Sequence, residues 1–178
     1  VRVPGNLRWE QAGIYTTLPA SDWAAMGVAA RNGLALEGNT LPASLILPMG
    51  RNGPAFLAYP NFGVFLEWNQ SLVYTVSAAY LATRINGAPK LERGNPGEIL
   101  SVDQTKALQA LLRARGYDVG EIDGIIGSGT RAGVRAVQME LGLPADAWPT
   151  RDLLAQLQGN QSSAAAPSAT PPLPNARP

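Results

Sequence analysis

The clearest periodic pattern in the chain lies between Ser71 and Ile85. Apolar residues recur there at helical intervals: Tyr74, Ala78, Leu81 and Ile85 on one stripe, and Val73, Val76 and Tyr80 on the next. This spacing predicts a helix, and Ser71 is a residue type that commonly caps a helix N-terminus. Because apolar side chains cover much of its circumference, we expect this helix to be mostly buried and to form the spine of the first part of the chain.

Shorter patterns precede this helix. The apolar runs at 45–47 and 55–59 predict two strands, and the Gly- and Pro-rich stretch 50–54 between them predicts a hairpin-like turn. Further upstream, Ser21 is expected to cap a short helix that ends near Gly27.

A second set of helical patterns occupies residues 99–158. Ser101 and Gln104 have the spacing of a capping box, a second helix is expected to begin near Ser128, and Thr150 is expected to cap a third. The inward positions are expected to be Leu108, Leu111, Leu112, Val134, Val137, Leu141, Leu153, Leu154 and Leu157. These residues predict a small three-helix domain.

Composition divides the chain into segments. Ten of the twelve aromatic residues lie before residue 87, and Gly, Pro and polar residues dominate the stretch that follows. We therefore expect one domain at 1–87, a flexible linker at 88–98 and the three-helix domain at 99–158. Residues 159–178 are rich in Ala, Ser and Pro and are predicted to be a disordered tail, because they cannot bury enough apolar surface.

Charge and composition exclude several functional classes. The 178 residues include 14 Lys and Arg against 13 Asp and Glu, a balance that argues against nucleic acid as a partner. There is no Cys and no His, which excludes thiolate nucleophiles, His bases and zinc sites built from these residues. Acid–base chemistry near neutral pH would therefore depend on a carboxylate. No metal and no cofactor is expected.

The N-terminal residue and the lengths of the apolar runs give an expectation about where the sequence comes from. It starts at Val1 rather than Met, and it contains no apolar run of the length that a transmembrane helix needs. We therefore expect the sequence to be a processed or excised piece of a longer protein.

The three-helix domain resembles the type 1 peptidoglycan-binding domain. The resemblance rests on Leu108-Gln109, Gly116-Tyr117, Ile122-Asp123-Gly124, Gly127, Thr130, Ala136-Val137-Gln138 and Gly142-Leu143-Pro144. Asp123 is expected to hold a loop rather than to contact a sugar. Two residues depart from the family pattern: Val137 replaces a usual Phe, and Ala147 follows Asp146 where Gly is usual. Alanine is disfavoured at positive φ, so the turn at Ala147 is expected to be strained.

The aromatic stretch resembles a second family. Pro60-Asn61-Phe62, then Trp68-Asn69 with Ser71 and Tyr74, then an apolar helix ending in Leu81-Ala82-Thr83-Arg84 are similar to the C-terminal motif of the lytic murein transglycosylase B family, glycoside hydrolase family 103. The resemblance extends from about residue 14 to residue 87. It implies a mainly α protein: the C-terminal part of a lysozyme-like α+β catalytic domain with a short β-hairpin, followed by the three-helix peptidoglycan-binding domain.

The resemblance also implies an activity. Such enzymes cleave the β-1,4 bond between N-acetylmuramic acid (MurNAc) and N-acetylglucosamine (GlcNAc) with one Glu and leave a 1,6-anhydroMurNAc end. That Glu belongs to a Glu-Ser-x-Phe-Gly-like motif, and no Glu-Ser pair occurs here. Glu10, Asp22, Glu37 and Glu67 lack that context and are expected to be surface charges. No catalytic residue is therefore assigned in this chain, which is expected to bind murein weakly and cut nothing.

The residues expected to bind substrate, by the same resemblance, are Asn69, Tyr74 and Trp68. An amide offers both a donor and an acceptor to an N-acetyl group, and aromatic faces pack on sugar rings. Structural alternatives remain for each residue: Asn69 ends one helix and admits the next, Tyr74 belongs to the core, and Trp68 only packs. Asn61 is expected to be a cap.

The sequence leaves two functions of the chain open. It is either part of a lytic transglycosylase or a non-catalytic cell-wall-binding protein with two glycan-contacting modules, and a purely structural helical protein is disfavoured. The expected partner is the glycan strand of peptidoglycan, bound by a monomer. The expected location is the bacterial cell envelope, in the periplasm or associated with the outer membrane.

Overall fold

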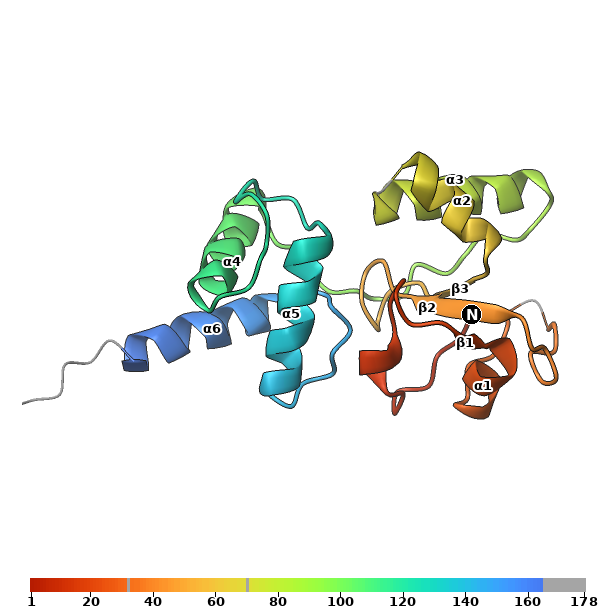
Figure 1. Ribbon diagram of the computed structural model, residues 1–178, viewed down its shortest axis with the longest axis horizontal. Helices are drawn as coiled ribbons and strands as arrows, with labels where there is room; N and C mark the ends of the chain where they lie inside the picture. The colour runs from red at the N-terminus through yellow and green to blue at the C-terminus, as the bar shows by residue number, and fades with distance from the viewer. Residues whose placement is uncertain (32, 70, 165–178) are drawn as a thin grey trace, which may run out of the picture.

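The computed structural model describes residues 1–31, 33–69 and 71–164 (Figure 1). Within these ranges the chain is mainly helical, with one small antiparallel sheet. The elements are a 3-10 helix Trp9–Gln11, β1 Leu18–Pro19, α1 Ala20–Ala25, β2 Pro42–Ile46, β3 Phe56–Ala58, α2 Asn61–Trp68, α3 Leu72–Ile85, α4 Val102–Ala114, α5 Ser128–Glu140 and α6 Arg151–Ala164. Among the described residues, no helix combines the length and the hydropathy that a membrane crossing requires.

The sheet has the order β1-β2-β3. The predicted pair of strands is confirmed, since β2 and β3 pair antiparallel with Leu45 opposite Leu57. Strand β1 was not predicted, because it has only two residues and one of them is proline. The core of this part is built around Trp23, which is fully buried and donates its indole N–H to the carbonyl of Ala43 (2.8 Å).

Helix α1 begins two residues earlier than the sequence suggested. Pro19 occupies the N-cap position, and the hydroxyl of Ser21 donates to the carboxylate of Asp22 instead. The prediction of Ser21 as the cap was therefore wrong: Pro19 has a fixed φ and no N–H, so it ends the strand and starts the helix at Ala20 without a side-chain cap. Gly27, at φ +89°, follows the end of the helix as expected.

Helices α2 and α3 pack on each other beside the sheet (Figure 1). The predicted helix and its cap are confirmed, because the backbone N–H of Tyr74 donates to the hydroxyl of Ser71 (3.4 Å). Pro60, rather than the predicted Asn61, precedes α2 as its N-cap.

The predicted burial of α3 was wrong. Thr75 is the one residue of this helix that is buried among the described residues, whereas Val73, Tyr74, Leu81 and Ile85 are exposed by 59%, 47%, 60% and 80%. The spacing of apolar residues correctly predicted a helix that is apolar over much of its circumference. That spacing carries no information about whether another element covers the apolar surface. Among the described elements, α2 is the one that α3 contacts extensively.

Helices α4, α5 and α6 form the second part, with a core of its own. The capping box of Ser101 and Gln104 is present, and the hydroxyl of Thr150 accepts the N–H of Leu153 (3.2 Å). The predicted inward residues are buried except Leu141, which is 37% exposed because it lies beyond the last turn of α5 as its C-cap. Helix α6 continues to Ala164, and the remainder of the predicted disordered tail, 165–178, lies outside the described residues.

A buried glutamine organises the turn between α4 and α5. Gln109 is 1% exposed; its amide oxygen accepts the N–H of Gly124 (2.9 Å), and its amide nitrogen donates to Asp123, Ile125 and Thr130. Asp123 also accepts the N–H of Ile125 (2.8 Å), and these hydrogen bonds hold its pKa below the usual value. Asp123 thus holds the loop, as expected.

The same arrangement recurs between α5 and α6. The amide of Gln138 accepts the N–H of Ala147 (2.9 Å) and donates to Asp146 (2.9 Å) and to the carbonyl of Trp148 (3.2 Å). Ala147 takes the place of Gly124 and has φ +59°, the one positive φ of a non-glycine residue among the described residues. The strain predicted for this turn is therefore present.

Replacing Ala147 with glycine is expected to raise the free energy of unfolding by about 1 kcal/mol. The left-handed conformation costs alanine about 1–2 kcal/mol, and the greater flexibility of unfolded glycine offsets part of that gain. Urea denaturation measures the change. The control is Ala132→Gly, an exposed position within α5, which should lose about 1 kcal/mol. Equal losses in both variants would contradict the assignment of strain.

The linker does not behave as a free tether in the structure. Its contacts include Leu91 N–H to the Tyr80 hydroxyl (3.0 Å), Glu92 to Arg31, Asn95 N–H to the Asn52 carbonyl (2.7 Å), and Glu98 to Arg151 (2.5 Å). The first three attach it to the first part of the chain and the last attaches it to α6. Its composition predicted an irregular segment but not these contacts.

Candidate functional site

The three residues expected to bind substrate meet where α2 passes into α3. Trp68 is the last residue of α2, Asn69 is its C-cap with extended backbone, and Tyr74 lies in the first turn of α3. The side-chain oxygen of Asn69 accepts the N–H of Ser71 (2.9 Å), and its carbonyl accepts the hydroxyl of Thr75 (2.8 Å). Asn69 therefore does end one helix and admit the next, and its half-buried amide lies at the surface rather than in a sealed core.

The two aromatic rings are adjacent and open to solvent. Their centroids are 5.6 Å apart with the ring planes tilted by 46°. Trp68 is 72% exposed and Tyr74 is 47% exposed, so neither ring belongs to the buried core. Exposed rings beside an amide form a surface suited to a sugar, since the rings pack on its apolar face and the amide pairs with its polar groups.

The carboxylates of the first part of the chain do not resemble a general acid. Glu10, Asp22, Glu37 and Glu67 are all exposed to solvent. A carboxyl group that donates a proton near neutral pH is usually enclosed in an apolar setting, and none of the four has one. In the part of the chain that the structure describes, no group of acidic residues is arranged to hold a metal ion either.

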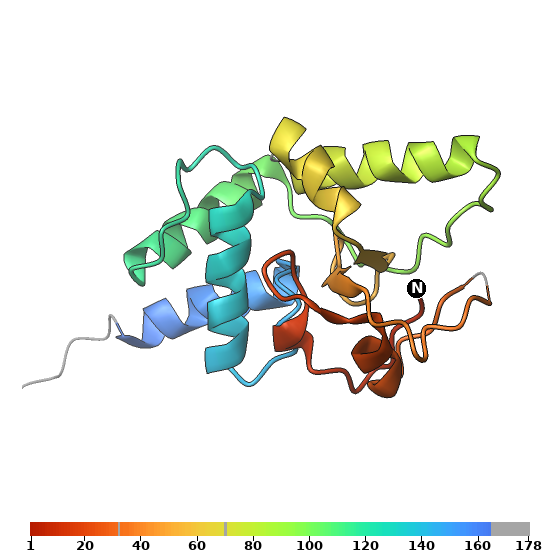
Figure 2. The ribbon, with the colours of Figure 1, turned by 45° about the vertical axis from the view of Figure 1, so that its right-hand side comes forward.

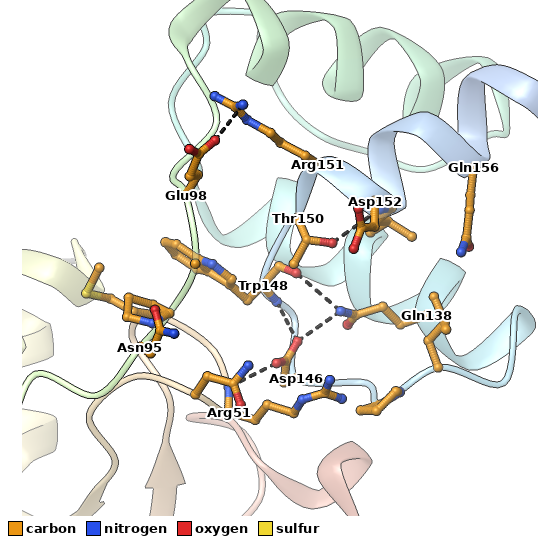
Figure 3. Close-up of a pocket in the computed structure, with 17 residues that line it drawn as sticks. Arg51, Asn95, Glu98, Gln138, Asp146, Trp148, Thr150, Arg151, Asp152 and Gln156 are labelled. Atoms are coloured by element: carbon orange, nitrogen blue, oxygen red, sulfur yellow. Dashed lines mark hydrogen bonds and ion pairs between the residues drawn. The ribbon is translucent and has the colours of Figure 1, made fainter.

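A second site, which sequence reasoning missed, lies between the two parts of the chain. It is a cleft of about 560 Å³, which we call the interdomain cleft (Figure 3). Its polar and charged lining comes from three segments that are far apart in sequence: Arg51 and Asn52, then Asn95 and Glu98, then Asp146, Thr150, Arg151, Asp152 and Gln156. No local sequence pattern links these residues, because only the fold brings them together.

Asp146 joins the two parts beside this cleft. One carboxylate oxygen accepts from Gln138 and from the N–H of Trp148 (3.0 Å), and the other accepts the N–H of Arg51 (2.9 Å). Figure 3 shows the carboxylate between these partners. Asp146 therefore completes its own turn and attaches that turn to the loop after β2.

Further contacts hold the same interface. Arg131 on α5 donates to the carbonyl of Pro48 (2.6 Å) and lies 5.3 Å from the ring centroid of Trp148. Burial lowers the pKa of Arg131, and the nearby carboxylate of Asp146 acts in the opposite direction. Arg135 donates to the carbonyl of Glu10. In both views the helices of the second part stand beside the sheet of the first (Figures 1 and 2).

Known proteins match both parts of the chain. Residues 1–83 match the family model of the transglycosylase SLT domain, and residues 101–157 match that of the peptidoglycan binding domain. The first part belongs to the transglycosylase SLT domain family and the second to the peptidoglycan-binding domain family. We refer to them as the transglycosylase part and the peptidoglycan-binding part.

Two solved structures of SltB3 from Pseudomonas aeruginosa are similar to the chain, one in complex with NAG-anhNAM-pentapeptide and one with NAG-NAM-pentapeptide. Each is 40% identical over 88% of this chain, with a TM-score of 0.73. The chain spans 43% of the length of those structures. Among curated proteins, none matches the chain.

Proposed function

We propose that the chain is the C-terminal portion of a peptidoglycan lytic transglycosylase. The reaction is cleavage of the MurNAc–GlcNAc β-1,4 bond with formation of a 1,6-anhydroMurNAc end. The observation that carries this proposal is the 40% identity to SltB3 across both parts of the chain, since the two SltB3 structures hold murein fragments. The exposed Trp68–Asn69–Tyr74 surface supports it, because it supplies the groups that a glycan needs.

In this function the residues of the chain bind and orient the glycan. Trp68 and Tyr74 pack on sugar rings, and the amide of Asn69 pairs with an N-acetyl or hydroxyl group. The proton donor is a Glu outside this chain, because the sequence contains no Glu-Ser pair and the four carboxylates of residues 1–87 are exposed. The substrate's own C6 hydroxyl is the nucleophile, so neither a cofactor nor a second carboxylate is required.

The exposed apolar surface of α3 supports the same proposal. Val73, Leu81 and Ile85 are each more than half exposed on one short helix. Clustered apolar surface of this kind usually contacts another protein surface. We assign it to contact with the rest of the catalytic domain, in a monomer located in the cell envelope, where murein lies.

Replacing Tyr74 with alanine tests the glycan surface. We expect about ten-fold weaker binding of a peptide-free (NAG-NAM)2 tetrasaccharide, since an aromatic ring buried by a sugar contributes on the order of 1.5 kcal/mol. Isothermal titration calorimetry measures the affinity. The matched control is Tyr15→Ala, because Tyr15 is 85% exposed and lies outside the α2–α3 junction. Equal affinities of both variants would remove the α2–α3 junction from the binding site.

A non-catalytic wall-binding protein with two glycan-contacting modules is the second candidate. The exposure of all four carboxylates in the first part of the chain favours it. The sequence encoded upstream of Val1 distinguishes the two functions. A Glu-Ser-x-Phe-Gly-like motif there supports the enzyme. The chain itself, incubated with purified sacculi, should release no 1,6-anhydromuropeptides, and their release would show that it already contains an acid.

A further inference from the structure

The interdomain cleft differs chemically from the α2–α3 junction. Its exposed lining contains cations in Arg51 and Arg151 and anions in Glu98 and Asp152, together with the amides of Asn52, Asn95 and Gln156. A third carboxylate in the lining, Asp146, is already engaged by Gln138 and by the backbone N–H groups of Trp148 and Arg51. The cleft thus offers charges of both signs to a ligand.

The one aromatic residue in the lining is not available to a sugar. Trp148 is 7% exposed, and the guanidinium of Arg131 lies over its ring. A neutral glycan needs open aromatic faces or dense hydroxyl pairing, and it gains little from full charges. The lining therefore suits a ligand that carries both carboxylate and ammonium groups.

We infer that the interdomain cleft binds the peptide stem of murein, while the glycan binds at the α2–α3 junction. This inference rests on the proposed function. The stem peptide is the part of murein with free carboxylates and an amine, and a pentapeptide is part of the ligand in both SltB3 structures. Carboxylates of the stem pair with Arg51 and Arg151, and its ammonium group pairs with Glu98 or Asp152.

The existing ion pair across the cleft does not oppose this binding. Glu98 and Arg151 pair with side chains that are 70% and 56% exposed. An exposed pair of this kind contributes about 0–1 kcal/mol, so exchanging it for pairs with a zwitterionic peptide costs little. Figure 3 shows the pair between Glu98 on the linker and Arg151 at the start of α6.

Arg51 permits a clean substitution. It holds the peptidoglycan-binding part through its backbone N–H, which Asp146 accepts, and not through its guanidinium. Arg51→Ala therefore removes the charge and leaves the contact between the two parts in place. Arg151→Ala likewise removes a charge without touching the core, because Arg151 is an exposed first residue of α6.

The experiment titrates the sugar-free murein pentapeptide into the full chain by isothermal titration calorimetry. We expect each variant, Arg51→Ala and Arg151→Ala, to bind the peptide about ten-fold more weakly, because a hydrogen bond to a charged group contributes about 1.5–3 kcal/mol. Arg8→Ala is the matched control, since Arg8 is exposed and lies outside the cleft lining. It should bind within about two-fold of the parent chain.

The outcomes separate this inference from the proposed function. No peptide binding, or peptide affinity that is the same in all three variants, overturns the inference. Retained binding of the peptide-free tetrasaccharide in that case leaves the proposed function intact. Loss of tetrasaccharide binding with retained, arginine-dependent peptide binding supports the cleft but counts against the glycan site at the α2–α3 junction.

Discussion

Replacing Gly50 with alanine should weaken the contact between the two parts of the chain by about 3 kcal/mol. Gly50 has φ +71°, where alanine loses about 1–2 kcal/mol, and a Cβ atom there would lie 2.6 Å from the Cβ of Trp148. Trp148 cannot move away freely, because its backbone N–H and carbonyl are held by Asp146 and Gln138. Relieving such an overlap costs a further 1–3 kcal/mol, roughly.

The measurement is the free energy of urea unfolding, followed through tryptophan fluorescence, together with the rate of proteolysis in the linker. The matched control is Gly38→Ala. Gly38 has a similar φ, +75°, but a Cβ there meets nothing within 4 Å, so only the backbone cost of about 1 kcal/mol applies. A loss at Gly50 no greater than that at Gly38 would show that the packing of Trp148 on this loop contributes nothing.

Replacing Gln109 with leucine is expected to destabilise the peptidoglycan-binding part by about 3 kcal/mol. Leucine fills a similar volume but provides neither the acceptor for Gly124 nor the donors for Asp123, Ile125 and Thr130. Each buried polar group left without a partner costs about 1–3 kcal/mol, and solvent can satisfy those near the surface.

Gln104→Ala on the same helix is the comparison. Gln104 accepts one hydrogen bond, from the N–H of Ser101 (2.9 Å), at the N-terminus of α4. Its loss should cost no more than about 1 kcal/mol in the same urea titration. If the two variants are equally stable, the hydrogen bonds of Gln109 do not stabilise the turn between α4 and α5. The similar hydrogen bonds of Gln138 would then not be expected to stabilise the turn between α5 and α6.

Local features of the fold were predictable from the sequence. The caps at Ser71, Ser101 and Thr150 depend on hydrogen bonds within three residues, so residue type and spacing suffice to predict them. The strain at Ala147 was predictable for a different reason, because the family pattern usually has Gly at this position and alanine is disfavoured at positive φ. Ser21 failed as a cap because the preceding Pro19 already fixes where the helix begins.

Burial and the interdomain cleft depend on long-range packing. The apolar stripe of α3 has the same spacing whether or not another element covers it, so the sequence overestimated its burial. The cleft combines Arg51, Glu98 and Arg151, which lie in three separate segments. The candidate glycan residues Trp68, Asn69 and Tyr74 were named from a family resemblance, which one short motif could carry because all three lie at a single helix junction.

The attachment of the linker changes how a bound strand is selected. A loose connection would let the peptidoglycan-binding part sample many separations. A linker held to the transglycosylase part, together with the contacts of Asp146 and Arg131 across the interface, keeps the α2–α3 junction and the interdomain cleft at one separation. If the two sites bind glycan and stem peptide as proposed, a strand that occupies both carries an uncleaved, uncrosslinked peptide at one particular sugar along its length. On that proposal, the position of free peptides on murein, rather than their number, decides which strands are retained.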